Sequence, residues 1–319
     1  MELTDIKTIT NVGAGTMGHA TALQFALAGY LVRLYDHQQA GLQRGKDAIA
    51  HDLATFEQAG LLKEQPAVIL ERITYTTDMA AACQDTDFVI ESIVEDQQVK
   101  QQVWQEIEQL VSPETTLATN TSGLSPTALQ SVLTHPERFV VAHFWNPAQL
   151  MPLVEVVPGK QTSQTTVDLT VALMNKIGKH AVPLKKEALG FVGNRIQLAV
   201  LREAFHIVAE GIASPEAVDD IIKYSLGRRW NLVGPIASAD LGGLDVFKNI
   251  SSYLYADLAN ATGTDPTLEK MVDNGKLGLK SGQGFYDWQG DTGKRIVADR
   301  DAALLDQLKH DHYEWPSDN

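Results

Sequence analysis

A histidine and a glutamate have the setting of a proton-transfer pair. His143 follows the apolar stretch 139–142, and Glu155 lies inside the apolar run 153–157. A carboxylate buried among apolar side chains needs a hydrogen-bonding partner, and an imidazole N–H group is a suitable one. A histidine oriented by a carboxylate can take up and return a proton near neutral pH. The two residues are candidates for general acid–base catalysis; a core histidine and a structural ion-pair partner are the alternative interpretations.

Ser122 is a third polar residue that follows a candidate strand, the one at 116–118. In open parallel sheets, ligands bind at the edge formed by the carboxyl ends of the strands. His143 also follows such a strand, so both residues are expected at the ligand-binding edge. The alternative for Ser122 is that it only caps the next helix.

A glycine-rich turn near the N-terminus has the spacing of a dinucleotide-binding site. Gly13, Gly15 and Gly18 come directly after an apolar strand and open a helical stretch, and Asp36 ends the next strand. The first glycine permits the tight turn, the second lets the backbone approach the pyrophosphate, and the third allows close helix packing. The phosphates would lie at the helix N-terminus, where free N–H groups favour negative charge.

Asp36 indicates which dinucleotide binds. Its carboxylate can accept hydrogen bonds from the adenosine ribose, and its charge would repel the 2′-phosphate of NADP. The residues that follow, His37-Gln38-Gln39, include no arginine for such a phosphate. The sequence therefore predicts NAD as the cofactor, with a solvated carboxylate at a strand end as the alternative for Asp36.

These residues need a sheet to position them, and the hydrophobic pattern predicts one. Short apolar runs alternate with helical stretches such as 99–110 and 167–177, which argues for a mostly parallel sheet. The candidate strands are 6–12, 30–35, 73–75, 88–93, 116–118, 139–142, 153–157 and 181–184. After Lys186 the strand pattern ends and helical periodicity continues. The expected fold is α/β: a Rossmann-type NAD-binding domain over 1–186, then an all-helical domain over 187–319 for substrate binding and dimerisation.

The composition excludes several classes of function. The 319-residue chain has a formal charge of −14, which disfavours binding to nucleic acids or anionic membranes. No apolar run reaches the roughly 20 residues of a membrane-spanning helix. Cys83 is the single cysteine, and residues 1–5 lack the basic and apolar regions of a signal peptide, so a cytoplasmic protein is expected. No histidine spacing is typical of a zinc site, and no metal is expected.

Several motifs, in order, resemble the L-3-hydroxyacyl-CoA dehydrogenase family over most of the chain. They are the glycine turn, Asn120-Thr121-Ser122, His143-Phe-Trp-Asn146-Pro147 with Leu153-Val154-Glu155, Gly190-Phe-Val-Gly-Asn194-Arg195, and Gly278 to Tyr286. The resemblance implies NAD-dependent oxidation of the 3-hydroxyl group of an L-3-hydroxyacyl-CoA, a short-chain one such as 3-hydroxybutyryl-CoA. It also implies a homodimer formed through the smaller domain.

The resemblance implies a role for each site residue. His143 would remove the hydroxyl proton as hydride leaves C3, and Glu155 would orient the ring and stabilise the imidazolium. Ser122 and Asn194 would hydrogen-bond substrate oxygens, and Asn146 would help to place the nicotinamide. The full set of expected cofactor contacts is Gly13, Gly15, Thr16, Met17, Gly18, Asp36, Glu95, Lys100, Asn120, Ser122, Asn146 and Lys280. Solvated surface charges are the alternative for Glu95, Lys100 and Lys280.

Two features favour a related branch of dehydrogenases. Where family members offer a serine and a lysine cluster to the CoA phosphates, residues 51–63 hold one lysine and two carboxylates, a poor clamp for a polyanion. Residues 226–230, Leu-Gly-Arg-Arg-Trp, resemble the branch of L-gulonate 3-dehydrogenase (lambda-crystallin) and carnitine dehydrogenase, which oxidises free 3-hydroxy acids. Arg229, or its neighbour Arg228, could pair with a substrate carboxylate, with a surface salt bridge as the alternative. A free acid is the second substrate hypothesis, and an NAD-binding protein without turnover is the third.

Overall fold

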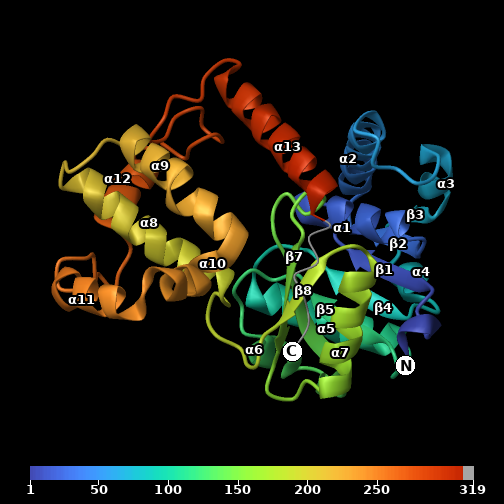
Figure 1. Ribbon diagram of the computed structural model, residues 1–319. Coiled ribbons are helices and arrows are strands. Elements are labelled where there is room, and N and C mark those ends of the chain that lie inside the picture. The colour runs from blue at the N-terminus through green and yellow to red at the C-terminus, as the bar shows by residue number, and fades with distance from the viewer. Residues whose placement is uncertain (312–319) are drawn as a thin grey trace. The chain divides into compact units, whose positions relative to one another are not determined.

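The chain forms two compact units (Figure 1). The computed structural model describes residues 1–311. Unit 1 comprises Met1–Asn194 with residues 300–311, and unit 2 comprises Arg195–Asp299. The sequence pattern puts the boundary at Lys186, whereas the contacts put it at Asn194, because Phe191 packs in the core of unit 1 against Val141 and Val157.

An eight-stranded sheet forms the centre of unit 1, with the strand order β3-β2-β1-β4-β5-β6-β7-β8. The strands are β1 (Thr8–Val12), β2 (Leu31–Tyr35), β3 (Ile73–Thr76), β4 (Phe88–Glu91), β5 (Thr116–Thr119), β6 (Phe139–Phe144), β7 (Leu153–Pro158) and β8 (His180–Pro183). All neighbours pair in parallel except β6 and β7, which are antiparallel. This confirms the predicted, mostly parallel Rossmann-type sheet.

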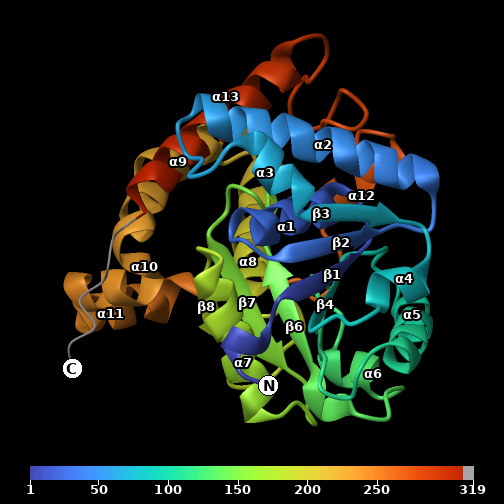
Figure 2. The same cartoon turned by 90° about the vertical axis from the view of Figure 1, so that its right-hand side faces the viewer.

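Helices cover both faces of this sheet (Figure 2). One face carries α1 (Thr16–Leu27), α2 (Gln39–Gln58), α3 (Pro66–Glu71) and α7 (Gln164–Lys176). The other carries α4 (Met79–Cys83), α5 (Gln97–Leu110) and α6 (Pro126–Gln130). The strands therefore bury apolar side chains on both faces, as a parallel sheet requires. Two short 3₁₀ helices, η1 (Leu3–Asp5) and η2 (Pro136–Arg138), complete the unit.

The helical domain predicted from the sequence is present. Its helices are α8 (Gly193–Ala209), α9 (Pro215–Tyr224), α10 (Leu226–Gly242), α11 (Leu244–Leu254), α12 (Pro266–Asp273) and α13 (Thr292–His310). The last of these continues into unit 1, where Leu304 and Leu305 pack against the core. In unit 2, α10 is kinked at Gly234, whose φ is +65°, directly before Pro235. No helix within residues 1–311 is long and apolar enough to cross a bilayer.

Candidate active site

His143 and Glu155 stand opposite each other on paired strands. In the antiparallel register of β6 and β7, His143 pairs with Glu155, so their side chains lie on the same face of the sheet. His143 Nδ1 is 2.9 Å from Glu155 Oε2, and the two residues are 4% and 3% exposed. The hydrogen bond expected for the buried carboxylate is therefore present.

Glu155 accepts hydrogen bonds on both carboxylate oxygens. Trp145 Nε1 donates to Oε2 at 3.3 Å, and the backbone N–H groups of Val192 and Gly193 donate to Oε1 at 3.0 and 3.1 Å. Burial alone would raise the pKa of Glu155, but the hydrogen bonds from His143 and from the two backbone amides outweigh burial and lower that pKa. Glu155 is therefore held as an anion.

This anion fixes the tautomer of His143. A carboxylate can only accept, so Nδ1 carries a proton and Nε2 keeps a lone pair. The imidazole ring lies between Trp145 and Phe191, at centroid distances of 5.6 and 5.5 Å. The ring is thus fixed in orientation, and its Nε2 can act as a general base.

The turn that supplies the two backbone donors has an unusual conformation. Gly190 and Phe191 both have positive φ, +72° and +54°. A positive φ is uncommon for a bulky residue, and burial of the Phe191 ring, which is 1% exposed, holds the turn in place. Gly193 must lack a side chain, because a Cβ there would lie 2.2 Å from the Trp145 ring. The sequence motif around Asn194 thus also positions Glu155, through the backbone N–H groups of this turn.

Ser122 and Asn194, predicted to bind substrate oxygens, are brought together. The Asn194 side-chain N–H donates to the Ser122 carbonyl oxygen at 2.8 Å. The cap of α6 is Ser125, whose hydroxyl accepts from the Ala128 N–H group, so Ser122 is not the helix cap considered as its alternative. The Ser122 side chain is exposed at the end of β5, the ligand-binding edge of the sheet.

Glu95 holds the loop that carries Ser122. Its Oε1 accepts from the Thr121 hydroxyl at 2.5 Å and from the backbone N–H groups of Ser122 and Gly123 at 2.8 and 3.3 Å. Its side chain is 43% exposed. The structure thus assigns it a structural task beside the candidate site in addition to any contact with the cofactor.

Lys100 is buried, contrary to the surface position considered as its alternative. It is 1% exposed, and its Nζ lies 2.5 Å from Glu91 and 3.5 Å from Glu95. Glu91 is fully buried and also accepts from the Thr119 hydroxyl. Sequence reasoning missed Glu91, although an acidic residue at the end of an apolar strand is a signal for a buried pair.

The two asparagines predicted to contact the cofactor differ in their surroundings. Asn120 is 8% exposed; its side chain donates to Ser92 and accepts from the Phe144 N–H group, which ties β4 to β6. Asn146 is exposed, directly after β6, and its peptide bond to Pro147 is cis. Of the two, Asn146 has the side chain that is available to a ligand.

The glycine turn has the shape that a pyrophosphate requires. Gly13 has a φ of +99°, and a Cβ on Gly18 would lie 1.7 Å from the Gly13 carbonyl oxygen. Gly15 is the N-cap of α1, and no side chain caps this helix, whereas Asp96 caps α5. The first N–H groups of α1 and the open space beside Gly15 therefore fit a bound pyrophosphate. Thr16 and Met17 form the first turn of this helix.

Asp36 lies beside this turn at the end of β2. Its carboxylate accepts from the backbone N–H groups of Ala14 and Gln38, at 3.1 and 3.0 Å. Gly41 makes room for it, because a Cβ there would lie 2.5 Å from the carboxyl group. A carboxylate can accept further hydrogen bonds, so Asp36 remains able to bind ribose hydroxyls.

A cavity of about 400 Å³ adjoins the glycine turn and Asp36. Its walls are mostly apolar and include Met79, Val94, Val99 and Val103. Apolar walls beside a carboxylate that can accept hydrogen bonds from ribose hydroxyls fit an adenine ring. Together with the glycine turn, this cavity has the features of an NAD site.

Two predicted residues lie in unit 2. Lys280 is exposed near the turn that contains Phe285, whose ring stacks on Phe205 at 5.3 Å. Arg229 is exposed on α10 and lines a pocket of about 330 Å³ with Leu232 and Ser238.

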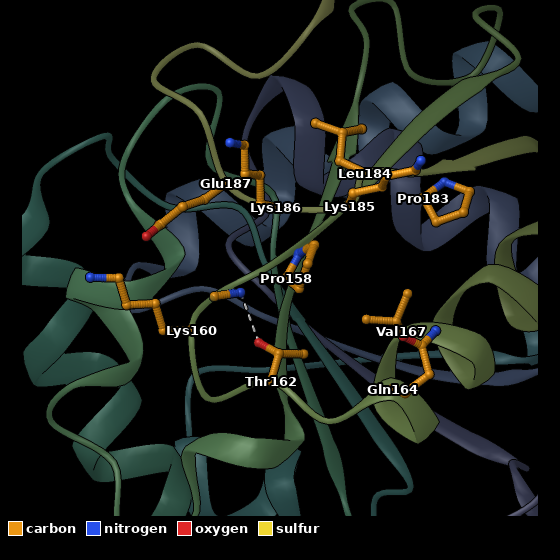
Figure 3. Close-up of a pocket in the computed structure, with 11 residues that line it drawn as sticks. Pro158, Lys160, Thr162, Gln164, Val167, Pro183, Leu184, Lys185, Lys186 and Glu187 are labelled. Carbon is orange, nitrogen blue, oxygen red and sulfur yellow. Dashed lines mark hydrogen bonds between the residues drawn. The ribbon is translucent and has the colours of Figure 1, made fainter.

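A second cleft in unit 1 contains none of the predicted site residues. It has a volume of about 760 Å³, lies beyond the C-terminal ends of β7 and β8, and is lined by Lys160, Lys185, Lys186 and Glu187, among others (Figure 3). Glu187 is engaged, since it accepts from the hydroxyl of Thr127 at 2.6 Å. Within residues 1–311, no group of histidine, cysteine or acidic side chains could hold a metal ion.

Family models identify the fold and the cofactor. The NAD-binding domain of 3-hydroxyacyl-CoA dehydrogenase matches residues 8–188, and the C-terminal domain of that family matches residues 190–288. The chain belongs to the 3-hydroxyacyl-CoA dehydrogenase family. It is therefore an NAD-dependent oxidoreductase, in agreement with the geometry of the glycine turn.

Relatives within this family have different substrates in their names. A probable 3-hydroxybutyryl-CoA dehydrogenase of Deinococcus radiodurans is 41% identical, over 86% of this chain and 98% of its own. The 5-formyl-3-hydroxy-2-methylpyridine 4-carboxylate 5-dehydrogenase of Mesorhizobium japonicum is 33% identical, over 94% and 96%. A crystal structure of an enzyme with that activity, an NAD⁺-dependent dismutase, has a TM-score of 0.90 at 32% identity and covers 95% of this chain and 99% of its own. An L-carnitine dehydrogenase of Bacillus cereus is 34% identical, over 75% and 72%.

Proposed function

We propose that this protein reversibly oxidises the 3-hydroxyl group of a short-chain L-3-hydroxyacyl-CoA to the 3-oxoacyl-CoA. The observation that carries the proposal is the buried hydrogen bond between His143 and Glu155, whose carboxylate also holds the turn that leads into Asn194, the partner of Ser122. The relative named as a probable 3-hydroxybutyryl-CoA dehydrogenase supports a short acyl chain and a CoA thioester in the substrate.

In the proposed mechanism, His143 is the proton acceptor. Nε2 takes the proton of the substrate hydroxyl group, and the electron pair of that O–H bond becomes part of the new carbonyl group as hydride leaves C3. NAD, when bound, supplies the acceptor for this hydride. Glu155 stabilises the resulting imidazolium, because its carboxylate already accepts the Nδ1 proton. The Asn194 side chain contacts the Ser122 backbone, which supports a role for these two residues in binding oxygens of one substrate.

We propose that the cofactor is held chiefly by unit 1. The residues are Gly13, Gly15, Thr16, Met17, Gly18, Asp36, Glu95, Lys100, Asn120, Ser122 and Asn146. The glycines and Asp36 are the best supported of these, because the free helix N-terminus and the adjoining cavity fit the dinucleotide. Lys100 acts through Glu95 and the Ser122 loop, since its ammonium group is buried.

A free 3-hydroxy acid is the second candidate substrate, and a pair of residues on α1 and α2 favours it. In α2, where a cation for CoA phosphates would be useful, Asp52 lies 3.2 Å from Nε2 of His19. The other ring nitrogen of His19 is 2.9 Å from the Gly15 carbonyl oxygen. Burial alone would lower the pKa of His19, but the hydrogen bonds to Asp52 and Gly15 raise it. The raised pKa favours a charged ring that the carboxylate neutralises, so the pair presents no net positive charge to a polyanion.

A paired assay with NADH distinguishes the two substrates. The reaction is followed by absorbance at 340 nm. We expect kcat/KM for acetoacetyl-CoA to be at least about 100-fold higher than kcat/KM for free acetoacetate or other 3-oxo acids. This ratio corresponds to about 3 kcal/mol in transition-state stabilisation. The reverse ranking would exclude the CoA thioester as the substrate. In that case Arg229→Ala should raise KM for the acid strongly, with Lys248→Ala, an exposed cation on α11, as the matched control. No turnover of any 3-oxo or 3-hydroxy compound would leave a binding protein.

We infer that the protein is a homodimer formed through unit 2. No hydrophobic side chain between Arg195 and Asp299 is buried, and Tyr224, Leu232, Ile236 and Leu241 are between 73% and 79% exposed. Apolar surface of this extent marks an interface, and a second copy carries the same surface. Light scattering should give twice the chain mass of 34.9 kDa. A single-chain mass at micromolar concentration would contradict the inference, and Ile236→Asp should shift the dimer towards the monomer.

We infer a cytoplasmic location for the protein. Cys83 is its only cysteine and is fully buried, so the fold is independent of disulfide bonds and suits a reducing compartment. Burial also raises the pKa of this thiol to about 12, which keeps it in the unreactive form.

A further inference from the structure

A buried lysine that the proposed mechanism does not use holds the loop between β6 and β7. Lys179 immediately precedes β8 and is 6% exposed. Its Nζ donates to the carbonyl oxygens of Ala148, at 2.7 Å, and Met151, at 3.0 Å. Both partners are backbone carbonyl groups, and in the described part of the chain no carboxylate pairs with this ammonium group.

The burial of Lys179 costs free energy, which its two hydrogen bonds offset in part. A lysine is almost never fully buried unless it is paired, and here burial lowers its pKa to about 7. The neutral amine still has two N–H groups, as many as the two carbonyl oxygens accept. Both protonation states can therefore hold the loop. A methionine of similar length could fill the space of the lysine side chain but could not donate hydrogen bonds to the loop.

This loop joins the two strands that carry the catalytic pair. It runs from Trp145, the donor to Glu155, through Asn146 to Pro152. The Pro147 carbonyl oxygen accepts from the N–H groups of Leu150 and Met151, so the segment is a compact turn. The loop has a second attachment: the side chain of Gln24, in α1, donates to the Gln149 carbonyl oxygen at 3.4 Å. The loop is thus attached both to the residue that precedes β8 and to the helix that begins at the glycine turn.

We propose that Lys179 is a positioning residue for hydride transfer. By fixing the carbonyl oxygens of Ala148 and Met151, it sets the position of Asn146 beside His143, and thereby the position of the nicotinamide. The proposal rests on the proposed function, in which Asn146 contacts the nicotinamide. A displacement of about 1 Å at such a contact can lower a rate about 100-fold. The effect should be confined to the nicotinamide half of the cofactor.

Lys179→Met tests this by comparing NAD with ADP-ribose, which lacks the nicotinamide. We expect the Kd for ADP-ribose to stay within about twofold of wild type and the Kd for NAD to rise about tenfold, since only one half of the cofactor site has moved. We expect kcat to fall about 10- to 100-fold, with a larger primary isotope effect for substrate deuterated at C3, because hydride transfer is the slowed step. Lys176→Met, an exposed lysine on α7, is the matched control and should behave as wild type.

A parallel loss of ADP-ribose and NAD binding would mean that Lys179 is only structural, and an unchanged kcat would also overturn the proposal. Lys179→Arg keeps the N–H donors and should recover turnover above that of Lys179→Met. If Lys179→Met does not fold, Gln24→Met removes the other attachment of the loop. It should give the same pattern, with changes of about threefold in kcat and in the Kd for NAD. Absence of turnover in the wild-type enzyme would remove the proposed function, whereas the two binding measurements would still decide the role of Lys179.

Discussion

His143→Gln lowers kcat by about 10³- to 10⁴-fold and leaves the Kd for NAD unchanged, as expected when a general base is removed without disturbing the cofactor site. Glutamine is similar in size to histidine and can fill the space between Trp145 and Phe191. It has no titratable nitrogen, so the hydroxyl proton would have to leave to water. Stopped-flow measurement of NADH formation, together with an NAD titration, provides both numbers. A fall of less than about tenfold would exclude His143 as the base.

Glu155→Gln should be nearly as damaging, because all the contacts of this carboxylate are donors. His143 and Trp145 donate to one oxygen, and the amides of Val192 and Gly193 donate to the other. A glutamine amide has only one oxygen. Its NH₂ group would therefore face other N–H donors, and the hydrogen bonds on that side would be lost. We expect kcat to fall about 10²- to 10³-fold, within the range for loss of acid–base catalysis. Trp145→Phe removes a single, longer hydrogen bond, and a loss of less than about tenfold is expected from it.

Gly18→Ala abolishes cofactor binding by opening the turn. Its Cβ would lie 1.7 Å from the Gly13 carbonyl oxygen, and Gly13 is itself confined by Ser92, since a Cβ on Gly13 would lie 2.6 Å from the Ser92 carbonyl oxygen. A clash between backbone atoms cannot be relieved by a change of rotamer. We expect the free energy of unfolding to fall by about 1–3 kcal/mol. The Kd for NAD should rise at least about 100-fold, which is a loss of about 3 kcal/mol in binding.

Gly15→Ala is the matched control, because no protein atom lies within 4 Å of a Cβ at that position. Its thermal midpoint without cofactor should equal that of the wild type, while its NAD affinity should fall, since the methyl group enters the space assigned to the pyrophosphate. Calorimetry of each variant with and without NAD separates the two effects. Wild-type affinity in Gly15→Ala would show that the phosphates bind elsewhere.

The cofactor turn and the strands around it follow from local sequence. Gly13, Gly15, Gly18 and Asp36 lie within one βαβ unit, where glycine spacing and apolar runs determine the backbone path directly. The family motifs likewise pointed to His143 and Glu155 from the sequence. Their alignment on paired strands depends on the antiparallel register of β6 and β7. Both strands are buried on both faces, so the apolar pattern does not specify this register and the tertiary structure sets it.

The groups that orient these residues were decided only by the tertiary structure. Val192 and Gly193 bind Glu155 through backbone N–H groups, which every residue type except proline supplies, so no side-chain pattern predicts these contacts. From the sequence, Lys179 is one more charged residue before a strand; only the fold brings the carbonyl oxygens of Ala148 and Met151 to it. Lys100 reads as a helix-surface charge until Glu91 meets it in the core. Local patterns determined which residues could do the chemistry. Contacts between residues distant in sequence determined which atoms orient those residues, because only folding sets the distances between them.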